Sequence, residues 1–287
     1  MSPVLNDYLI LTKVRITALV LVTTAAGFLL ASGPQLELGL LAWTLLGTGL
    51  AASGAAALNQ YIEREADARM RRTAGRPIPA GRMTPRHGLA VGVGLSGIGV
   101  ALLAGTVNLL TAFLALATVI LYVGVYTPLK RMTPLNTMVG AIPGAIPPVM
   151  GWTAVTGQLG LPAGVLFAIL FLWQLPHFLA IAWIFREDYR LGGFPMLPVV
   201  DPDGDVTGRQ VALYCAALVP VSLIPTFLGL TGAVYFFGAL ALGLAFLATG
   251  LAMAISRGKG AARRVLLASV TYLPLLLALL VVDRSPL

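Results

Sequence analysis

Nine long apolar runs divide this chain, and they constrain its fold more than any other feature. They cover residues 16–31, 38–58, 88–104, 109–126, 135–155, 162–184, 211–230, 234–255 and 264–282. Each is close to the roughly 20 residues that a helix needs to cross a bilayer. Helices satisfy their own backbone hydrogen bonds in lipid, and the runs are too long and too poor in charge for strands. We therefore expect an all-α integral membrane protein with nine transmembrane helices in one domain, residues 1–287.

The composition agrees with a chain that lives in a lipid bilayer. Of its 287 residues 58% are hydrophobic and only 10% are charged, which is more apolar surface than a soluble domain needs. The single cysteine, Cys215, excludes an internal disulfide. The first apolar run is long and lacks a cleavage site, and the N-terminal segment is not rich in Arg and Ser. These features favour the inner membrane of a prokaryote.

The positive charge follows membrane topology. A net charge of +8 could indicate nucleic acid as a partner, but the basic residues lie in short loops between apolar runs, so we expect none. With nine spans, eighteen of the nineteen Lys and Arg residues fall on the N-terminal side. The positive-inside rule then predicts a cytoplasmic N-terminus and a C-terminus on the opposite side. Nine of the eleven acids share the cytoplasmic side, which points to chemistry there.

The most polar segment, residues 59–82, begins where the second apolar run ends. It reads N-Q-Y-I-E-R-E-A-D-A-R-M-R-R-T-A-G-R-P-I-P-A-G-R, with three acids and six arginines. Asn59, Glu63 and Asp67 are four residues apart, so on a helix each lies only about 40° around from the last. Such oxygen ligands suit Mg²⁺, which binds carboxylates together with substrate phosphates. The pattern predicts a catalytic site for Mg²⁺ and a phosphate ester, against the alternative of a solvated helix end with Glu–Arg pairs such as Glu65 with Arg69.

Basic residues of two loops are candidates for contact with the phosphates. Arginine forks match phosphate oxygens, and a second loop reads Y-T-P-L-K-R-M-T-P-L-N. The alternative is that these residues serve only as topology anchors, with an interfacial tyrosine. The candidates are Arg64, Arg72, Arg76, Tyr126, Lys130 and Arg131.

Two further residues stand out in and after the sixth run. Asp188 follows the end of that run and is a candidate fourth metal ligand. His177 lies inside it, and an ionisable residue within a membrane segment is a functional candidate by default. Imidazole is also a common iron ligand. The fifth run carries Pro143, Pro147 and Pro148, so we expect a helix that is bent and buried or that lines a cavity.

Three segments together resemble the UbiA-type intramembrane prenyltransferases, and within them the branch of protoheme IX farnesyltransferases. They are residues 59–82, residues 126–154 (Y-T-P-L-K-R-M-T-P-L-N-T-M-V-G-A-I-P-G-A-I-P-P-V-M-G-W-T-A) and residues 176–200 (P-H-F-L-A-I-A-W-I-F-R-E-D-Y-R-L-G-G-F-P-M-L-P-V-V). The resemblance covers nearly the whole chain. The chain departs from the usual pattern at Glu63 and Glu65, where Asp is common, and at Val14, where Pro is common. Gly192 stands where quinone-type relatives carry a second acid.

The resemblance implies a UbiA-type helix bundle with a cytoplasm-facing cavity. It implies transfer of a farnesyl group from farnesyl diphosphate to the 2-vinyl group of protoheme IX, giving heme O, with Mg²⁺ on Asn59, Glu63, Asp67 and Asp188. His177 and Arg186 would contact the heme, and a heme A synthase is a candidate partner. Two alternatives remain: a prenyltransferase for an aromatic quinone precursor, and a membrane transporter, which would usually place coupling residues near the midplane.

Overall fold

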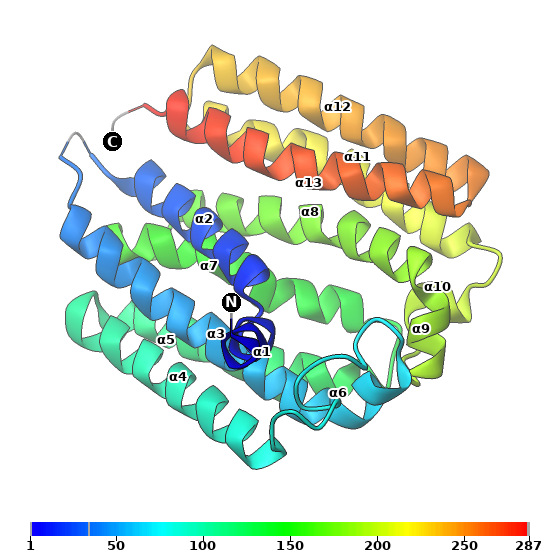
Figure 1. Cartoon of the computed structure of the whole chain (residues 1–287). Coiled ribbons are helices and arrows are strands. Elements are labelled where there is room, and N and C mark those ends of the chain that lie inside the picture. Colours follow the sequence, from blue (N-terminus) through cyan, green and yellow to red (C-terminus); the bar gives the residue numbers. More distant parts are fainter. Residues whose placement is uncertain (1, 34, 286–287) are drawn as a thin grey trace.

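Long helices lie side by side in the computed structural model, which describes residues 2–33 and 35–285 (Figure 1). Within those ranges nine segments are long and apolar enough to cross a membrane, which confirms the predicted number. They are α2 (Val14–Ala31), α3 (Leu38–Arg69), α4 (Pro85–Thr106), Leu109–Leu129, α7 (Asn136–Thr156), α8 (Leu161–Ile184), α11 (Asp205–Phe227), α12 (Ala233–Ser256) and α13 (Lys259–Val282). No β-strand occurs among the described residues, so the all-α fold is also confirmed.

The fourth of these segments changes its helix type. It starts as α5 (Leu109–Val119), continues as a π-helix (Ile120–Tyr126) and ends as the short α6 (Thr127–Leu129). π-Helical turns are rare and are often found at functional sites. Three further short helices lie outside the spans: α1 (Pro3–Leu11), α9 (Arg186–Leu191) and α10 (Leu197–Val200).

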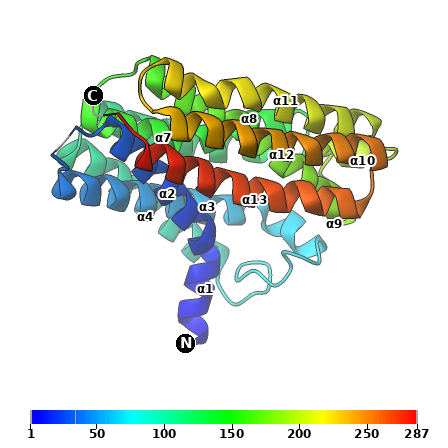
Figure 2. The same ribbon diagram turned by 90° about the horizontal axis from the view of Figure 1, so that it is seen from above.

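The polar end of the bundle, which we define as residues 70–84, 130–135 and 185–204, joins the helices on one side. In Figure 1 its cyan loop and the helices α6, α9 and α10 gather at the same end. Helix α1 projects from the bundle beside that loop (Figure 2). Helix α3 extends to Arg69, well past the apolar run that ends at residue 58, because its last turns keep one face buried against the protein.

Helix α7 packs against both α2 and α8 despite its three prolines. It remains one continuous helix and is the most buried of the nine, with 67% of its apolar window inside the protein. The prediction that this segment is buried is therefore confirmed. It packs on α2 and α8 at close range: a Cβ added at Gly151 would overlap the Thr24 carbonyl oxygen, and one at Gly144 would overlap the Gln174 side chain. Small residues allow such close helix contacts in membranes.

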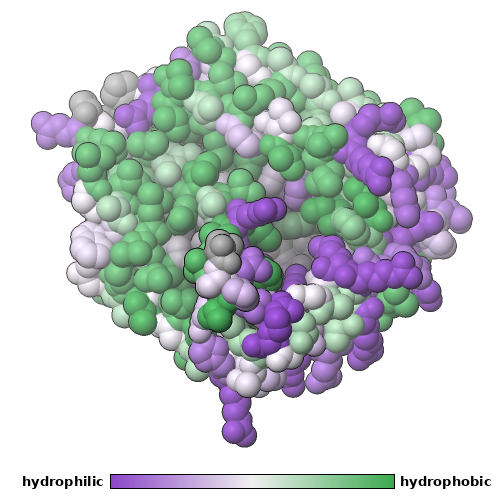
Figure 3. Space-filling model, in the orientation of Figure 1, coloured by the Kyte–Doolittle hydropathy of each residue, from purple (hydrophilic) through white to green (hydrophobic). Residues whose placement is uncertain are grey.

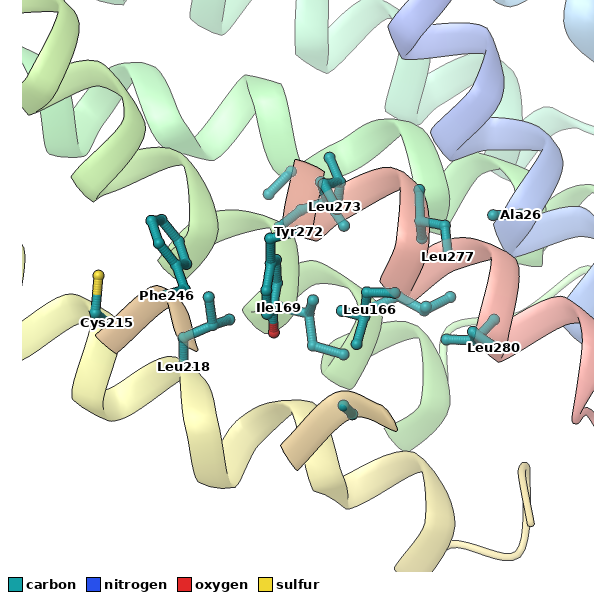
Figure 4. Close-up of a cluster of buried hydrophobic side chains, with 14 of the residues drawn as sticks. Ala26, Leu166, Ile169, Cys215, Leu218, Phe246, Tyr272, Leu273, Leu277 and Leu280 are labelled. Carbon is teal, nitrogen blue, oxygen red and sulfur yellow. The ribbon is translucent and has the colours of Figure 1, made fainter. Parts of the chain in front are cut away.

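A second close crossing joins α3 to α4. A Cβ at Gly54 would meet Ser96, and one at Gly99 would meet the backbone of Ala51. The largest apolar core lies instead between α8, α11, α12 and α13, where Tyr272, Phe246 and Leu218 are almost fully buried (Figure 4). Cys215, the only cysteine, is buried in this core as a free thiol. This core packs α13 against α8.

Candidate active site

The last turns of α3 carry the residues that the sequence selected first. Asn59, Glu63 and Asp67 are 1%, 3% and 0% exposed, whereas the side chain of Glu65 is 66% exposed. The prediction that the first three share a face of a helix is confirmed by this pattern of burial. Two carboxylates buried in a membrane protein must be compensated by partners, because an unpaired buried charge is very costly.

Each of these three side chains meets a cation from a different segment. Lys13 Nζ lies 2.8 Å from Asn59 Oδ1, and Lys130 Nζ lies 2.7 Å from Glu63 Oε1. Arg76 Nη1 lies 2.6 Å from Asp67 Oδ2. The result is a compact cluster with three basic side chains against two carboxylates, which leaves it suited to a negatively charged ligand.

The donor set fits a divalent cation. Asp67 Oδ1 is fully buried and has no hydrogen-bond partner within the described residues. Such an orphaned carboxylate oxygen is unusual, since buried polar atoms are nearly always satisfied. Together with the Glu63 carboxylate and Asn59 Oδ1, it offers the hard oxygen ligands that Mg²⁺ prefers. The described residues do not, however, gather three or more His, Cys, Asp or Glu side chains into one metal-binding group.

Lys13 is a site residue that the sequence analysis treated only as a topology signal. It joins α1 to α2 in a left-handed backbone conformation, with φ at 48°, and its Nζ is also 3.3 Å from Tyr122 Oη. Burial, together with the positive charge of Arg76, lowers the pKa of Lys13 to about 7. The only signal in the sequence was its position at the start of an apolar run.

The π-helix presents two tyrosines to this cluster. The rings of Tyr122 and Tyr126 stack with their centroids 5.5 Å apart, and Lys130 Nζ lies 5.3 Å from the centroid of Tyr126. Asn59 Nδ2 donates to Thr127 Oγ1 at 3.1 Å. Burial opposes the charge of Lys130, but the Tyr126 and Glu63 side chains still raise its pKa above the usual value. The π-helix and α6 thus pack against α3, and the cluster receives Tyr122, Thr127 and the loop cation Lys130 from this part of the chain.

Other candidate diphosphate residues lie farther out. Arg72 donates to Tyr189 Oη at 3.1 Å, with its guanidinium 5.3 Å from the Phe185 ring centroid. Arg64 covers the Tyr61 ring and pairs with Glu65 at 3.4 Å, so the predicted Glu65–Arg69 pair is wrong. Arg64 reaches Glu65 Oε1 with Nη2, while its Nη1 donates to the Tyr61 carbonyl oxygen at 2.8 Å. Arg131 is exposed.

Arg186 and Asp188 lie in the first turn of α9. Asp188 lines a surface pocket of about 360 Å³ with Arg71, Glu187 and Lys259. Among the described residues, Asp188 does not join the acids of α3 in a group of three or more possible metal ligands. Arg186 donates to the Pro202 carbonyl oxygen at 3.1 Å and covers the Trp183 ring. The assignments of Asp188 to a metal and of Arg186 to an acceptor stay predictions.

His177 belongs to a separate, neutral group between α8 and α13. Its Nδ1 lies 2.7 Å from Ser269 Oγ, and its ring stacks on Trp173 with centroids 5.0 Å apart.

The surface of the molecule has a recess in the middle of the face that Figure 1 presents, and hydrophilic side chains gather beside it toward the polar end (Figure 3). Hydrophobic side chains cover most of the rest of this face (Figure 3).

The cluster is buried at one end of the membrane bundle, and its charges suit a polyanion with a divalent cation. This arrangement is typical of a membrane enzyme that acts on diphosphates. Residues 20–281 match the UbiA prenyltransferase family, and the chain belongs to that family. It is 50% identical to the protoheme IX farnesyltransferase of Solibacter usitatus, covering 98% of this chain and 99% of the relative. It is 47% identical to that of Koribacter versatilis, covering 99% of this chain and 95% of the relative.

Solved structures share the fold at low identity. The structure of a digeranylgeranylglyceryl phosphate synthase matches 97% of this chain and 98% of its own chain, with a TM-score of 0.81 and 16% identity. A UbiA homolog from Archaeoglobus fulgidus, bound to GPP and Mg²⁺, matches 96% of this chain and 99% of its own, with a TM-score of 0.69 and 15% identity. The predicted UbiA-type bundle is therefore confirmed.

Proposed function

We propose that this prenyltransferase transfers the farnesyl group of farnesyl diphosphate to the 2-vinyl group of protoheme IX, giving heme O and diphosphate. The single observation that carries the first half is the buried face of Asn59, Glu63 and Asp67, with a cation on each residue. The choice of acceptor is supported by relatives that are about half identical over nearly the whole chain and are named protoheme IX farnesyltransferases.

The diphosphate would be bound by the cations of the cluster. Lys13, Lys130 and Arg76 now point at oxygen atoms of α3, and each can turn to a phosphate oxygen when the ligand arrives. Arg64, Arg72, Arg131 and Tyr126 stay predicted contacts in the outer part of this site. Cations held in place before the reaction stabilise the negative charge that develops on the leaving group.

Asn59, Glu63 and Asp67 would hold Mg²⁺, with Asp188 as a predicted fourth ligand. When bound, the ion neutralises charge on the diphosphate and makes it a better leaving group. The orphaned Asp67 Oδ1 supports this assignment, because it is a buried ligand atom that no protein group satisfies. The Archaeoglobus fulgidus UbiA homolog, which was solved with GPP and Mg²⁺, supports the assignment by analogy of fold.

The remaining steps need an apolar, dry surrounding. Departure of diphosphate leaves an allylic cation on the farnesyl chain, and the electron-rich vinyl group attacks it to form the new carbon–carbon bond. The positive charge then lies on the former vinyl carbon next to the porphyrin, where water adds and loses a proton to give the hydroxyethylfarnesyl substituent. The helix walls would hold the farnesyl tail and the porphyrin and delay early capture by water. His177 is proposed to bind the heme iron, and Arg186 to contact the heme.

The topology follows from charge. We propose the inner membrane of a bacterium, with the N-terminus and the polar end on the cytoplasmic side, because eighteen of nineteen basic residues fall on that side. The C-terminus would lie opposite; its last two residues are outside the described ranges. A heme A synthase as partner stays a prediction.

The purified protein in detergent, with farnesyl diphosphate and Mg²⁺, tests the proposal when it is offered protoheme or 4-hydroxybenzoate. We expect heme O from the first and no prenylated product from the second, by mass spectrometry. A prenylated benzoate would identify an aromatic prenyltransferase, and no product from either acceptor would overturn the proposal.

A further inference from the structure

Three side chains connect α8 to α13 without any charge. His177 Nδ1 lies 2.7 Å from Ser269 Oγ, and Trp173 Nε1 donates to the Ser269 carbonyl oxygen at 2.8 Å. The Trp173 and His177 rings are nearly parallel, with an interplanar angle of 22°. Ser269 is therefore held through both its backbone and its side chain, and the imidazole is held by a hydrogen bond and a stacked ring.

The position of one proton decides the form of His177. Ser269 Oγ is also 2.6 Å from the carbonyl oxygen of Leu266, one turn back on α13. A carbonyl oxygen can only accept, so the single hydroxyl proton of Ser269 must lie between these two atoms. Ser269 Oγ can then only accept from the imidazole. It follows that Nδ1 of His177 carries the ring proton.

The other ring nitrogen, Nε2, consequently carries a free lone pair. In a neutral imidazole one nitrogen donates and the other accepts. Nε2 of His177 makes no hydrogen bond among the described residues, and it is not one of their fully enclosed polar atoms without a partner. It therefore keeps some accessible surface. Histidines that bind metals typically use the other ring N–H in this way, which fixes the tautomer and the ring orientation.

We propose that Ser269 is a positioning residue that holds His177 in its Nδ1–H form, so that Nε2 is ready to bind the iron of the acceptor heme. This rests on the proposed function for the identity of the acceptor. The tautomer itself follows from the hydrogen bonds between α8 and α13 alone. Trp173 supports the arrangement by keeping the imidazole stacked and Ser269 in register.

The tautomer can be measured without any heme. The chain has only two histidines, so ring-labelled histidine in the variant His87→Asn leaves one imidazole signal, that of His177. Nitrogen and carbon chemical shifts distinguish the two neutral forms. We expect the Nδ1–H form in this protein, and a shift toward the Nε2–H form in the same background with Ser269→Ala. A predominantly Nε2–H imidazole before the Ser269 substitution overturns the proposal.

Binding of ferric protoheme tests the consequence. We expect His177→Ala to remove the spectrum of axially ligated heme and Ser269→Ala to weaken heme binding about 10-fold or more, in line with losses of outer partners at metal sites. Ser269→Thr keeps the hydroxyl and should restore binding. Ser222→Ala is the matched control, because Ser222 is also buried and donates to its own helix, at Val219 O, but touches no histidine.

The outcomes separate this inference from the proposed function. Unchanged heme binding in Ser269→Ala, or loss in Ser269→Thr equal to that in Ser269→Ala, overturns the role of Ser269. An unchanged heme spectrum in His177→Ala overturns ligation by His177 and therefore the proposal as a whole. Failure of the proposed function would appear elsewhere, as absence of heme O from the unmodified protein.

Discussion

The end of α3 and the contact between α8 and α13 solve different binding problems with different chemistry. At the end of α3, two buried carboxylates and an amide are matched by cations from three separate segments. Between α8 and α13, His177, Trp173 and Ser269 make only neutral hydrogen bonds and a stacked pair of rings. Under the proposed function, the first region would bind a charged group and the second a flat, largely apolar one.

Under the proposed function, this difference between the two regions explains how one bundle holds two dissimilar substrates. Charged contacts inside a membrane protein are strong but costly, and they work only when every charge has a partner or a ligand. Neutral contacts cost less to bury and can fix the orientation of a ring. Variants of the first region should therefore affect diphosphate binding and turnover, and variants of the second should affect the acceptor alone.

The largest effect is expected from Asp67→Ala. It removes a proposed metal ligand and leaves Arg76 without its partner, so turnover should fall by about 10²–10³-fold, as for the loss of a preorganised electrostatic contact. The rate of heme O formation at saturating substrates measures this. Glu65→Gln is the control, because among the described residues that exposed acid pairs with Arg64 alone. Equal activities in the two variants would contradict the assignment of a metal to this face of α3.

A smaller loss is expected from Lys13→Ala. The charged hydrogen bond that Lys13 can give to diphosphate is worth about 1.5–3 kcal/mol, so affinity should drop roughly 10- to 100-fold. Binding of a non-hydrolysable farnesyl diphosphate analogue measures it, and Lys13→Arg should recover part of the loss. Arg15→Ala, an exposed change two residues away, should have little effect. If Arg15→Ala and Lys13→Ala weaken binding equally, only net charge near the N-terminus matters.

Trp173→Phe should produce a change confined to the second region. It keeps an aromatic ring against His177 but removes the donor to the Ser269 carbonyl oxygen, at a cost of about 1 kcal/mol, or roughly a fivefold loss of heme affinity. Spectroscopic titration with protoheme measures it, and binding of the diphosphate analogue should be unchanged. A parallel loss of both ligands would show that the two regions do not act separately.

The smallest effect concerns α1, which carries Lys13 to the site. Asp7 accepts from Arg82 through both oxygens, at 3.0 and 3.1 Å to Nε, and Gln60 Nε2 donates to the Ile10 and Leu11 carbonyl oxygens. The side chain of Arg82 is 44% exposed, so solvent weakens this ion pair and we expect only a small effect. We expect Asp7→Asn to raise the KM for farnesyl diphosphate two- to fivefold. A double-mutant cycle with Arg82→Gln checks it, and additive effects would mean that the pair does not hold α1.

Much of the α3 site was predictable because it depends on local spacing. Residues four apart on a helix share a face, so Asn59, Glu63 and Asp67 could be grouped without any tertiary information, and burial bears this out. Lys130 and Arg76 were candidates by chemistry, yet their particular partners, Glu63 and Asp67, came only from the structure. Lys13 was missed because 46 residues separate it from Asn59.

The sequence by itself determined the membrane bundle, its nine spans and the polar face of α3, because hydropathy and helical period act over short stretches of chain. Only the tertiary structure decided which cation meets which oxygen, and that a π-helix brings Tyr122, Tyr126 and Lys130 to that face. It also placed Ser269 against His177, 92 residues away. Contacts between distant segments depend on how helices pack side by side, and a single sequence does not record that packing.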